Sequence, residues 1–252
     1  MDLASAQQTV TWAILILAPI TFCALLFYPA QYGGRHTSQG DRWLVPGKPA
    51  WVIMELPAVV GIAYFFFTGP DPFRPAALIC FGMWQLHYVD RTFLYPLRQR
   101  SQAPQRLYIA ATAFAYQSAN GFVNGYALSH APHLEAGWLS EPRFVLGVGL
   151  FAVGFYINRQ SDHILRNLRK PGETGYKVPH GGMYPLISCP NYFGEILIWS
   201  GFALASWTLA GASFAIWTCA NLIPRALTHH RWYQSKFSDY PPGRKAVIPG
   251  LL

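Results

Sequence analysis

Residues 196–224 contain no charged side chain, and this gap limits what the chain can fold into more than any other feature. A helix that crosses a membrane needs roughly 20 mostly apolar residues. Charged residues make up only 12% of the chain, about half the usual share, while hydrophobic residues reach 52%. The composition therefore excludes a disordered chain, a coiled coil and a collagen. It predicts an integral membrane protein.

Seven segments are apolar enough to predict membrane-spanning helices. They are residues 9–28, 50–68, 73–95, 106–130, 142–159, 185–207 and 208–227. The last two are open to a second interpretation, because one long helix can replace them if no turn occurs near Thr208–Gly211. We expect the first segment to be a retained helix and not a signal peptide, since the residues before it include an acid and no basic residue.

The distribution of Lys and Arg favours seven spans over six. With seven spans, 17 of the 19 basic residues lie on one side, and only Arg74 and Arg143 lie on the other. Merging the last two spans changes the division to 12 against 7. The sequence therefore predicts an all-α integral membrane protein, a single seven-helix domain over residues 1–252, with the N-terminus outside and the C-terminus in the cytoplasm. The loop 159–184 and the tail 228–252 then lie on the cytoplasmic side.

Ionisable and amide side chains gather in the cytoplasmic halves of five predicted helices. Because such groups are costly inside a membrane, each is a candidate for function. Residues three or four positions apart share a helix face, and most of these side chains have that spacing. The set consists of Glu55, Tyr88 with Arg91, Asn158 with Asp162, Asn191 with Glu195, and Arg225 with His229 and Tyr233. We expect them to line one cavity that opens to the cytoplasm.

Each of these groups also has an ordinary structural interpretation. An asparagine often joins two helices through a hydrogen bond, and Arg91 or Arg225 can reach the lipid headgroups. Tyr88 and Trp51 can belong to the aromatic belt at the membrane interface. Glu55 is harder to explain in this way, because an unpaired carboxylate costs several kcal/mol in an apolar environment. The convergence of five helices favours a buried polar site.

The predicted loop 159–184 adds a basic cluster beside this cavity. Its members are Arg166, Arg169, Lys170 and Lys177. They meet either anionic lipid or a phosphate-bearing ligand, and spacing alone leaves both interpretations open. The net charge of +8 lies next to the expected membrane, so no nucleic-acid partner is expected. The four cysteines have no metal-binding spacing, so no metal is expected either.

Five segments resemble the steroid 5α-reductase family (3-oxo-5α-steroid 4-dehydrogenases), and together they extend over nearly the whole chain. They are QYGGRHT at 31–37, MELP at 54–57, LHYVDRTFLYPL at 86–97, the stretch 157–196 that begins INRQSDHILRNLRKPGE, and the stretch 225–249 that begins RALTHHRWY. The last two are specific signals, whereas MELP alone is weak.

The resemblance implies a seven-helix enzyme that uses NADPH to reduce the C4–C5 double bond of a Δ4-3-oxosteroid. By the same resemblance, Glu55 and Tyr88 are catalytic residues that polarise the steroid 3-oxo oxygen, and Trp51 lines the steroid pocket with them. The residues implied to bind NADPH are Arg91, Asn158, Asp162, Arg169, Tyr176, Asn191, Arg225, His229 and Tyr233. Met54 departs from the pattern, because many animal members have Gln there, and this puts the steroid preference in doubt.

The residues suit this chemistry. Hydride addition to C5 of a conjugated enone moves negative charge onto the 3-oxygen, so catalysis needs donors aimed at that oxygen. A protonated Glu55 and the Tyr88 hydroxyl can both donate. The steroid is expected to enter from the bilayer, with membrane lipids around the protein and no obligatory protein partner. The expected location is the endoplasmic reticulum membrane in a eukaryote, or the cytoplasmic membrane if the chain is a bacterial homologue.

Three other functions fit parts of the same pattern. A membrane reductase of a polyprenol or an enoyl-CoA needs the same cofactor residues and a different pocket. An integral membrane methyltransferase using S-adenosylmethionine can share the C-terminal helices, but it gives Glu55 and Tyr88 no task. A seven-helix receptor or transporter also stays open, but a retinal protein is excluded, because it needs a lysine in the last span and residues 208–227 contain none.

Overall fold

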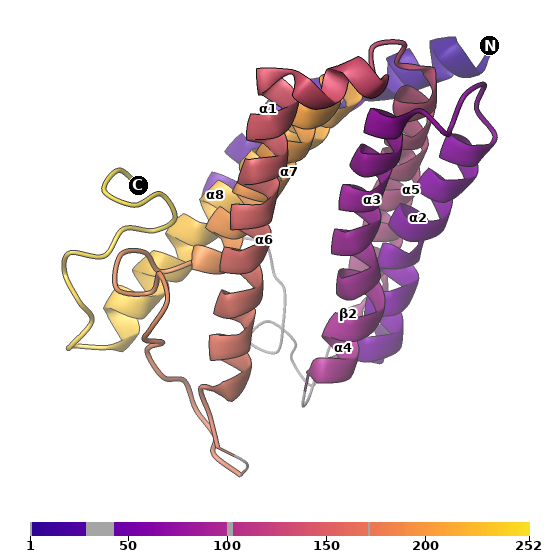
Figure 1. The fold of residues 1–252 in the computed structure, drawn as a ribbon. Helices are drawn as coiled ribbons and strands as arrows, with labels where there is room; N and C mark the ends of the chain where they lie inside the picture. The colour runs from indigo at the N-terminus through magenta and orange to yellow at the C-terminus, as the bar shows by residue number, and fades with distance from the viewer. Residues whose placement is uncertain (1, 29–42, 100–102, 171) are drawn as a thin grey trace.

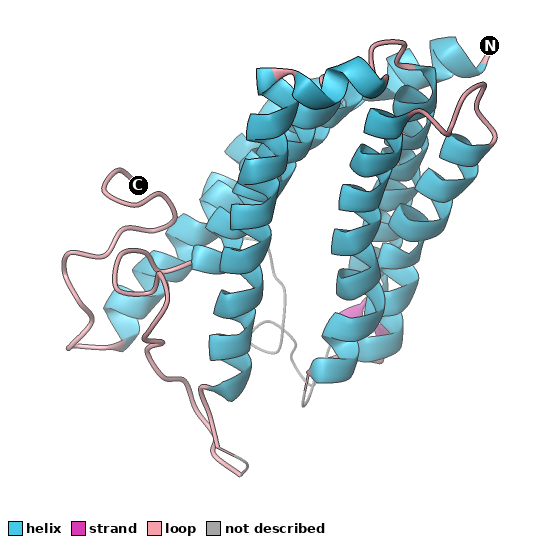
Figure 2. Cartoon of the chain, in the orientation of Figure 1, coloured by secondary structure: helices cyan, strands magenta, loops and turns pink. Residues whose placement is uncertain are grey.

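A computed structural model describes residues 2–28, 43–99, 103–170 and 172–252, and almost all of its regular structure is helical (Figures 1 and 2). The long helices are α1 (Leu3–Phe27), α2 (Gly47–Phe67), α3 (Pro75–Val89), α5 (Leu107–His130), α6 (Pro142–Asn167), α7 (Pro190–Ser206) and α8 (Leu209–Lys236). The all-α prediction is confirmed. The segment QYGGRHT at 31–37 lies outside the described residues, as do Arg42 and Arg100.

Local sequence signals explain where several helices begin. A proline occupies the first helical position of α3, α6 and α7, where its fixed φ suits a helix and no amide donor is lost. The Thr208 hydroxyl accepts a hydrogen bond from the Gly211 amide at 3.0 Å and caps α8. Trp207 before it is left-handed, with φ of 46°. The turn expected near Thr208–Gly211 is therefore present, and α7 and α8 are separate helices.

Several predicted bounds differ from the structure, and three of the differences fall beside the polar residues. α6 continues to Asn167, because Ser161 and Asp162 are still buried against neighbouring helices, so the loop predicted at 159–184 begins too early. The first residues of the tail predicted at 228–252 are helical, since α8 continues to Lys236. The segment predicted as one helix at 73–95 is α3 followed by a π-helical turn, Asp90–Leu94, and the short helix α4 (Tyr95–Arg98).

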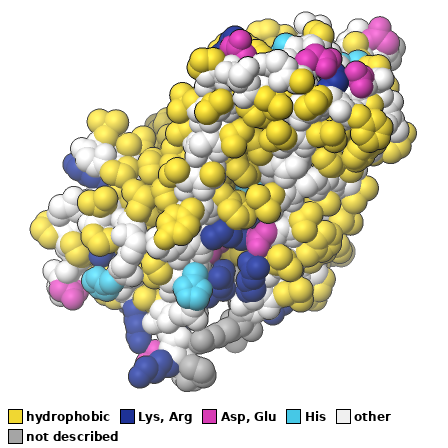
Figure 3. Space-filling view, viewed as in Figure 1, with side chains coloured by type: hydrophobic (Ala, Val, Ile, Leu, Met, Phe, Trp, Pro, Cys, Tyr) yellow, Lys and Arg dark blue, Asp and Glu magenta, His cyan; other side chains and the backbone are white. Residues whose placement is uncertain are grey.

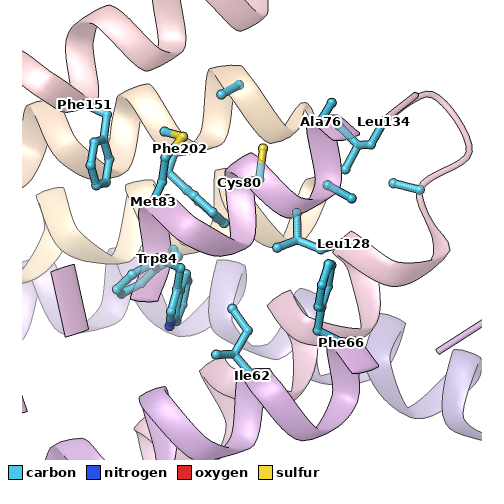
Figure 4. Packing of buried hydrophobic residues seen from close by; sticks show 14 of the residues in the cluster. Ile62, Phe66, Ala76, Cys80, Met83, Trp84, Leu128, Leu134, Phe151 and Phe202 are labelled. Carbon is cyan, nitrogen blue, oxygen red and sulfur yellow. The ribbon is translucent and has the colours of Figure 1, made fainter. Parts of the chain in front are cut away.

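The long helices form two bundles. α2, α3 and α5 pack together in one, and α6, α7 and α8 pack in the other, with α1 lying against α8 and α5 (Figure 1). The bundles meet where α3 packs on α7: the Trp84 ring lies 5.1 Å from that of Trp199 and 5.3 Å from that of Phe202. Figure 4 shows Trp84 and Phe202 in this shared core, with Ile62 from α2 nearby. α3 therefore holds the two bundles in a fixed relation.

Glycines let helices within each bundle approach closely at the depth of the polar residues. A Cβ atom on Gly154 of α6 would lie 2.6 Å from the Gly194 carbonyl oxygen of α7. A Cβ atom on Gly121 of α5 would lie 2.8 Å from the Pro57 carbonyl oxygen of α2. Small residues permit this backbone contact. A short antiparallel ladder also links α2 to α5. In it β1 (Leu44–Val45), just before α2, pairs with β2 (Gln105–Arg106), just before α5.

Two helices among the described residues are long and apolar enough to cross a membrane by length and composition. They are α1, with a mean hydropathy of 2.4, and α2, with 1.9. Hydrophobic side chains cover the middle of the face in Figure 3, and Lys and Arg gather toward its lower end. The N-terminus and the α2–α3 connection lie at the upper end in Figure 1, and the α6–α7 loop extends to the lower end. The seven spans and their orientation stay predictions.

Candidate active site

Glu55 and Tyr88 come from different helices and meet around a third side chain, Gln117 of α5. The Gln117 amide nitrogen Nε2 donates to Glu55 Oε2 at 2.7 Å, and it lies 3.2 Å from the Tyr88 hydroxyl oxygen. The same hydroxyl lies 3.3 Å from Gln117 Oε1. Glu55 is 8% exposed and Tyr88 is 3% exposed. The two side chains singled out in the sequence are therefore buried neighbours.

α5 carries two further amides on the Gln117 face. Asn120 Nδ2 donates to Gln117 Oε1 at 3.4 Å, and Asn124 Nδ2 donates to Asn120 Oδ1 at 2.9 Å. Both asparagines are buried. These two asparagines were not among the residues expected from the sequence. Their spacing of three and four positions within an apolar helix was the signal that could have found them.

A second buried carboxylate, Glu195 of α7, gathers donors from three helices. Asn158 Nδ2 lies 3.2 Å from Glu195 Oε1, and Trp199 Nε1 donates to Oε2 at 3.0 Å. His87 Nε2 lies 3.5 Å from Oε2, and Arg91 Nη1 lies 3.7 Å from Oε1. Glu195 was expected from its spacing with Asn191. His87 was not selected from the sequence, although it lies four positions before Arg91 and so shares its helix face.

Arg91 also stacks on two aromatic rings. Its guanidinium carbon lies 4.9 Å from the centroid of the Trp51 ring and 5.2 Å from that of Tyr95. The Trp51 indole nitrogen donates to the Arg91 carbonyl oxygen at 2.9 Å. The structure thus places Trp51 against a predicted cofactor residue. Its predicted contact with steroid stays untested.

An ion-pair network links the two bundles beside these residues. Asp90, in the π-helical turn, pairs with Arg159 of α6 and accepts a hydrogen bond from Arg98 Nη1 at 2.7 Å. Arg159 Nη2 also donates to Asn158 Oδ1 at 2.6 Å and lies 3.5 Å from Asp162 Oδ2. π-Helical turns are frequent at functional sites. The sequence analysis missed Asp90 and Arg159, because their meeting depends on how the bundles pack.

A cleft of about 320 Å³ lies between α8, the start of α7 and the end of α6 with the loop that follows it. Its lining includes five of the predicted cofactor residues: Arg169, Tyr176, Asn191, His229 and Tyr233. The Tyr192 hydroxyl lies 3.3 Å from His229 Nε2. The Asn191 carbonyl oxygen accepts from Asn158 Nδ2 at 3.0 Å, so the cleft adjoins the buried cluster around Glu195.

Charged and aromatic side chains shape the loop and tail beside this cleft. Lys177 Nζ donates to Glu173, and this hydrogen bond, with one from the Lys170 amide, holds the pKa of the Glu173 carboxyl below its usual value. Ser188 Oγ lies 2.6 Å from both His230 Nδ1 and the Tyr240 hydroxyl, which fixes the tail against the segment before α7. Burial, and then the charge of Lys245, lower the pKa of His230.

The predicted cofactor residues therefore form two neighbouring groups. Arg91, Asn158 and Asp162 belong to the buried network between the bundles, and the other group lines the cleft. Arg225 is half-buried on α8, one turn before His229, and is not among the residues that line the cleft. Within the described residues, no group of His, Cys, Asp and Glu has the arrangement of a metal site.

Comparison with known proteins matches this chain to a family. The profile of the 3-oxo-5-alpha-steroid 4-dehydrogenase family matches residues 103–252, which include α5 to α8 and the cleft. The chain belongs to this family. It is therefore related to oxidoreductases that act on a CH–CH group, and the resemblance found in the sequence is confirmed.

Relatives from animals and plants match nearly the full length. The chain is 43% identical over 252 residues to the Homo sapiens protein named 3-oxo-5-alpha-steroid 4-dehydrogenase 1, with 98% of this chain and 97% of the human protein aligned. It is 43% identical over 244 residues to the Mus musculus protein of the same name, which covers 94% and 93%. It is 39% identical over 245 residues to the Arabidopsis thaliana steroid 5-alpha-reductase DET2, which again covers 94% and 93%.

Proposed function

We propose that this protein reduces the C4–C5 double bond of a Δ4-3-oxosteroid with NADPH and forms a 5α-3-oxosteroid. One observation carries the proposal beyond family membership: Glu55 and Tyr88, from α2 and α3, are buried together around Gln117. Two hydroxyl-type donors at one point inside a helical bundle suit the oxygen of a ketone. A pair of side chains that only joined α2 to α3 would not need an ionisable carboxyl group such as that of Glu55.

The proposed reaction needs both donors at the 3-oxo oxygen. When C5 accepts a hydride, the electrons of the C4–C5 double bond shift toward C3 and the 3-oxygen becomes an enolate oxygen. Preorganised donors aimed at such an oxygen lower the barrier, because they stabilise charge that develops only in the transition state. The Tyr88 hydroxyl and a protonated Glu55 each donate one hydrogen bond to it. C4 then takes a proton, which gives the saturated ketone.

The cleft and the buried network fit a dinucleotide. Arg169 supplies a cation at the cleft, and Tyr176 and Tyr233 supply flat aromatic surfaces. Asn158 lies between Glu195 and the Asn191 backbone, at the inner end of this region. NADPH, when bound, supplies the hydride for C5. We assign the phosphates to Arg169, which lines the cleft, and to Arg225, which lies outside the lining but one helical turn before His229. The inner end of the dinucleotide is assigned to Arg91, Asn158 and Asp162.

The steroid is proposed to enter from the lipid bilayer, which explains why a reductase of this kind lies in a membrane. Trp51, Glu55 and Tyr88 are assigned to the steroid pocket. In this proposal the cleft faces the cytoplasm, where NADPH is found, and the N-terminus lies outside. The membrane is the endoplasmic reticulum in a eukaryote or the cytoplasmic membrane in a bacterium.

Purified protein incubated with NADPH and either testosterone or progesterone tests this proposal. Chromatography against authentic standards should show the 5α-reduced steroid, and omitting NADPH should abolish it. NADH in a parallel incubation measures the preference for the phosphorylated cofactor. If no Δ4-3-oxosteroid is reduced while a polyprenol or an enoyl-CoA is, the chain is a reductase of another lipid.

A further inference from the structure

The amides on α5 form a directed chain of hydrogen bonds that ends on Glu55. Asn124 Nδ2 donates to Asn120 Oδ1 at 2.9 Å, Asn120 Nδ2 donates to Gln117 Oε1 at 3.4 Å, and Gln117 Nε2 donates to Glu55 Oε2 at 2.7 Å. Every donor points the same way along the helix. Hydrogen bonds in such a chain polarise one another, so the last donor in it is stronger than an isolated amide.

Burying these amide groups in an apolar helix destabilises the fold unless they form hydrogen bonds or serve a function. Asn120 is fully buried and Asn124 is 1% exposed, in a helix whose other residues are mostly apolar. A buried amide without hydrogen bonds destabilises the folded protein, because its donors and acceptors have lost water and gained no partner. Here each amide hydrogen-bonds to the next, and only the Gln117 end reaches another helix near the proposed reaction.

The direction of the chain decides which oxygen of Glu55 can carry a proton. In a protonated carboxyl the carbonyl oxygen is the stronger acceptor, and the hydroxyl oxygen carries the donor proton. Because Gln117 donates to Oε2, that oxygen is the acceptor, and the proton is left to Oε1. The same Nε2 lies 3.2 Å from the Tyr88 hydroxyl oxygen, so one amide contacts both proposed donors.

We propose that Gln117 is a positioning residue for the reduction: with Asn120 and Asn124 behind it, its amide fixes Glu55 with the acidic proton on Oε1 and holds the Tyr88 hydroxyl beside it. This inference rests on the proposed function. Gln117 acts through its two neighbours and is not assigned a contact with the steroid. Its removal therefore slows turnover without weakening NADPH binding.

The ordinary alternative is that Gln117 only joins α5 to α2. The chain offers a matched control for that alternative in Gln85 of α3. Gln85 Nε2 donates to the Val59 carbonyl oxygen of α2 at 3.0 Å, which is also a hydrogen bond between helices and does not involve Glu55. Loss of helix packing alone should affect Gln117 and Gln85 variants alike.

The experiment compares Gln117→Met with Gln85→Met, each made in the wild-type protein and in a Glu55→Gln background. Met keeps the length of the side chain and suits a helix. We expect Gln117→Met to lower kcat by roughly 10-fold, near the upper end of what the loss of a hydrogen bond between neutral groups causes. KM for NADPH and the midpoint of thermal unfolding should match those of Gln85→Met.

In the Glu55→Gln background the acidic proton is absent, so the further loss from Gln117→Met should be under about threefold. Residues that act as a unit are non-additive in this way. A kcat within twofold of wild type for Gln117→Met overturns the inference, as does an equal loss in both backgrounds or an equal loss in Gln85→Met. If Gln117→Met does not fold, Gln117→Leu takes its place. A wild-type protein that reduces no steroid overturns the proposed function instead, before Gln117 is judged.

Discussion

The two halves of the candidate site are built in opposite ways. Glu55 and Tyr88 are buried, and defined hydrogen bonds to the half-buried Gln117 hold them within the protein. Around the cleft, Arg169 is exposed and Tyr176 is 49% exposed. A group fixed before the ligand arrives can stabilise a transition state, because no reorganisation is needed at the moment of reaction. The open, exposed cleft instead becomes ordered when the ligand binds. Substitutions at Glu55 or Tyr88 should therefore alter the turnover rate, and substitutions at the cleft should alter the binding of NADPH.

The largest effect is expected at the buried pair. Glu55→Gln removes the acidic proton, and Tyr88→Phe removes only a hydroxyl. Each should cut turnover by roughly 10²–10³, the loss typical of one oxyanion donor. KM for NADPH should change little in both, because neither side chain is assigned to the cofactor.

Two variants serve as controls for these changes. Glu141→Gln alters a half-exposed acid at the start of α6, and Tyr64→Phe alters an exposed tyrosine of α2. Both should keep normal turnover. If steroid reduction by Glu55→Gln and Tyr88→Phe is near normal, Glu55 and Tyr88 are structural, and the comparison between the two halves fails.

A smaller effect, on KM for NADPH and not on turnover, is expected for the arginines at and beside the cleft. Arg169→Ala and Arg225→Ala should each raise KM for NADPH by roughly 10- to 100-fold, since a charge-assisted contact is worth about 1.5–3 kcal/mol. Turnover at saturating NADPH should stay close to wild type. Arg143→Ala, which removes an arginine near the opposite end of α6, is the control. An unchanged NADPH requirement in both test variants would assign Arg169 and Arg225 to lipid binding or topology.

A few-fold fall in kcat/KM is expected from a change at Trp51, which contacts Arg91 where the two halves of the site meet. Trp51→Phe keeps an aromatic ring beneath the Arg91 guanidinium but removes the hydrogen bond to the Arg91 carbonyl oxygen. That bond is worth about 0.5–1.5 kcal/mol, so kcat/KM should fall between about 2- and 10-fold. Steady-state kinetics with each substrate varied in turn will show whether the steroid or NADPH carries the change. An unaltered kcat/KM would remove Trp51 from the site.

The orientation in the membrane can be read with labels that should leave activity intact. Ser140→Cys lies in the connection before α6, and Ser238→Cys lies in the tail; both positions are exposed. With the exposed Cys23 replaced by Ser, a membrane-impermeant thiol reagent should label Ser140→Cys from outside and Ser238→Cys only from the cytoplasm. Labelling of both from one side would show that the number of spans is not seven.

Sequence periodicity predicted the helices well because each apolar stretch determines its own helix. It also predicted that Asn158, Asn191 and Glu195 converge, since each helix presents its polar face to the interior. It failed where contacts depend on how distant segments pack. Asp90 meets Arg159, and Gln117 meets Glu55, only because two bundles and two glycine-lined helix pairs fix their distance. The local sequence around each residue does not determine how far apart these helices lie.

The length of α6 was missed for a related reason. Arg159 and the polar residues after it suggested a loop at the membrane surface, yet Asn158 and Asp162 are buried by α7 and by the π-helical turn. Burial by another helix keeps a polar segment helical when its own composition predicts a loop. The cofactor residues expected from that loop consequently divide between a rigid helix and the flanks of an open cleft.

The proposed transfer of a hydride from NADPH to C5 of the steroid can be followed directly with NADPH that carries deuterium at the reactive C4 position of its nicotinamide ring. Purified wild-type protein would be incubated with this cofactor and testosterone or progesterone, and the product analysed by mass spectrometry and NMR. We expect a 5α-reduced steroid that carries one deuterium, located at C5, and no deuterium at C4. A product with deuterium at another carbon, or no 5α-reduced steroid at all, would contradict the assignment of this chain as an NADPH-dependent steroid 5α-reductase.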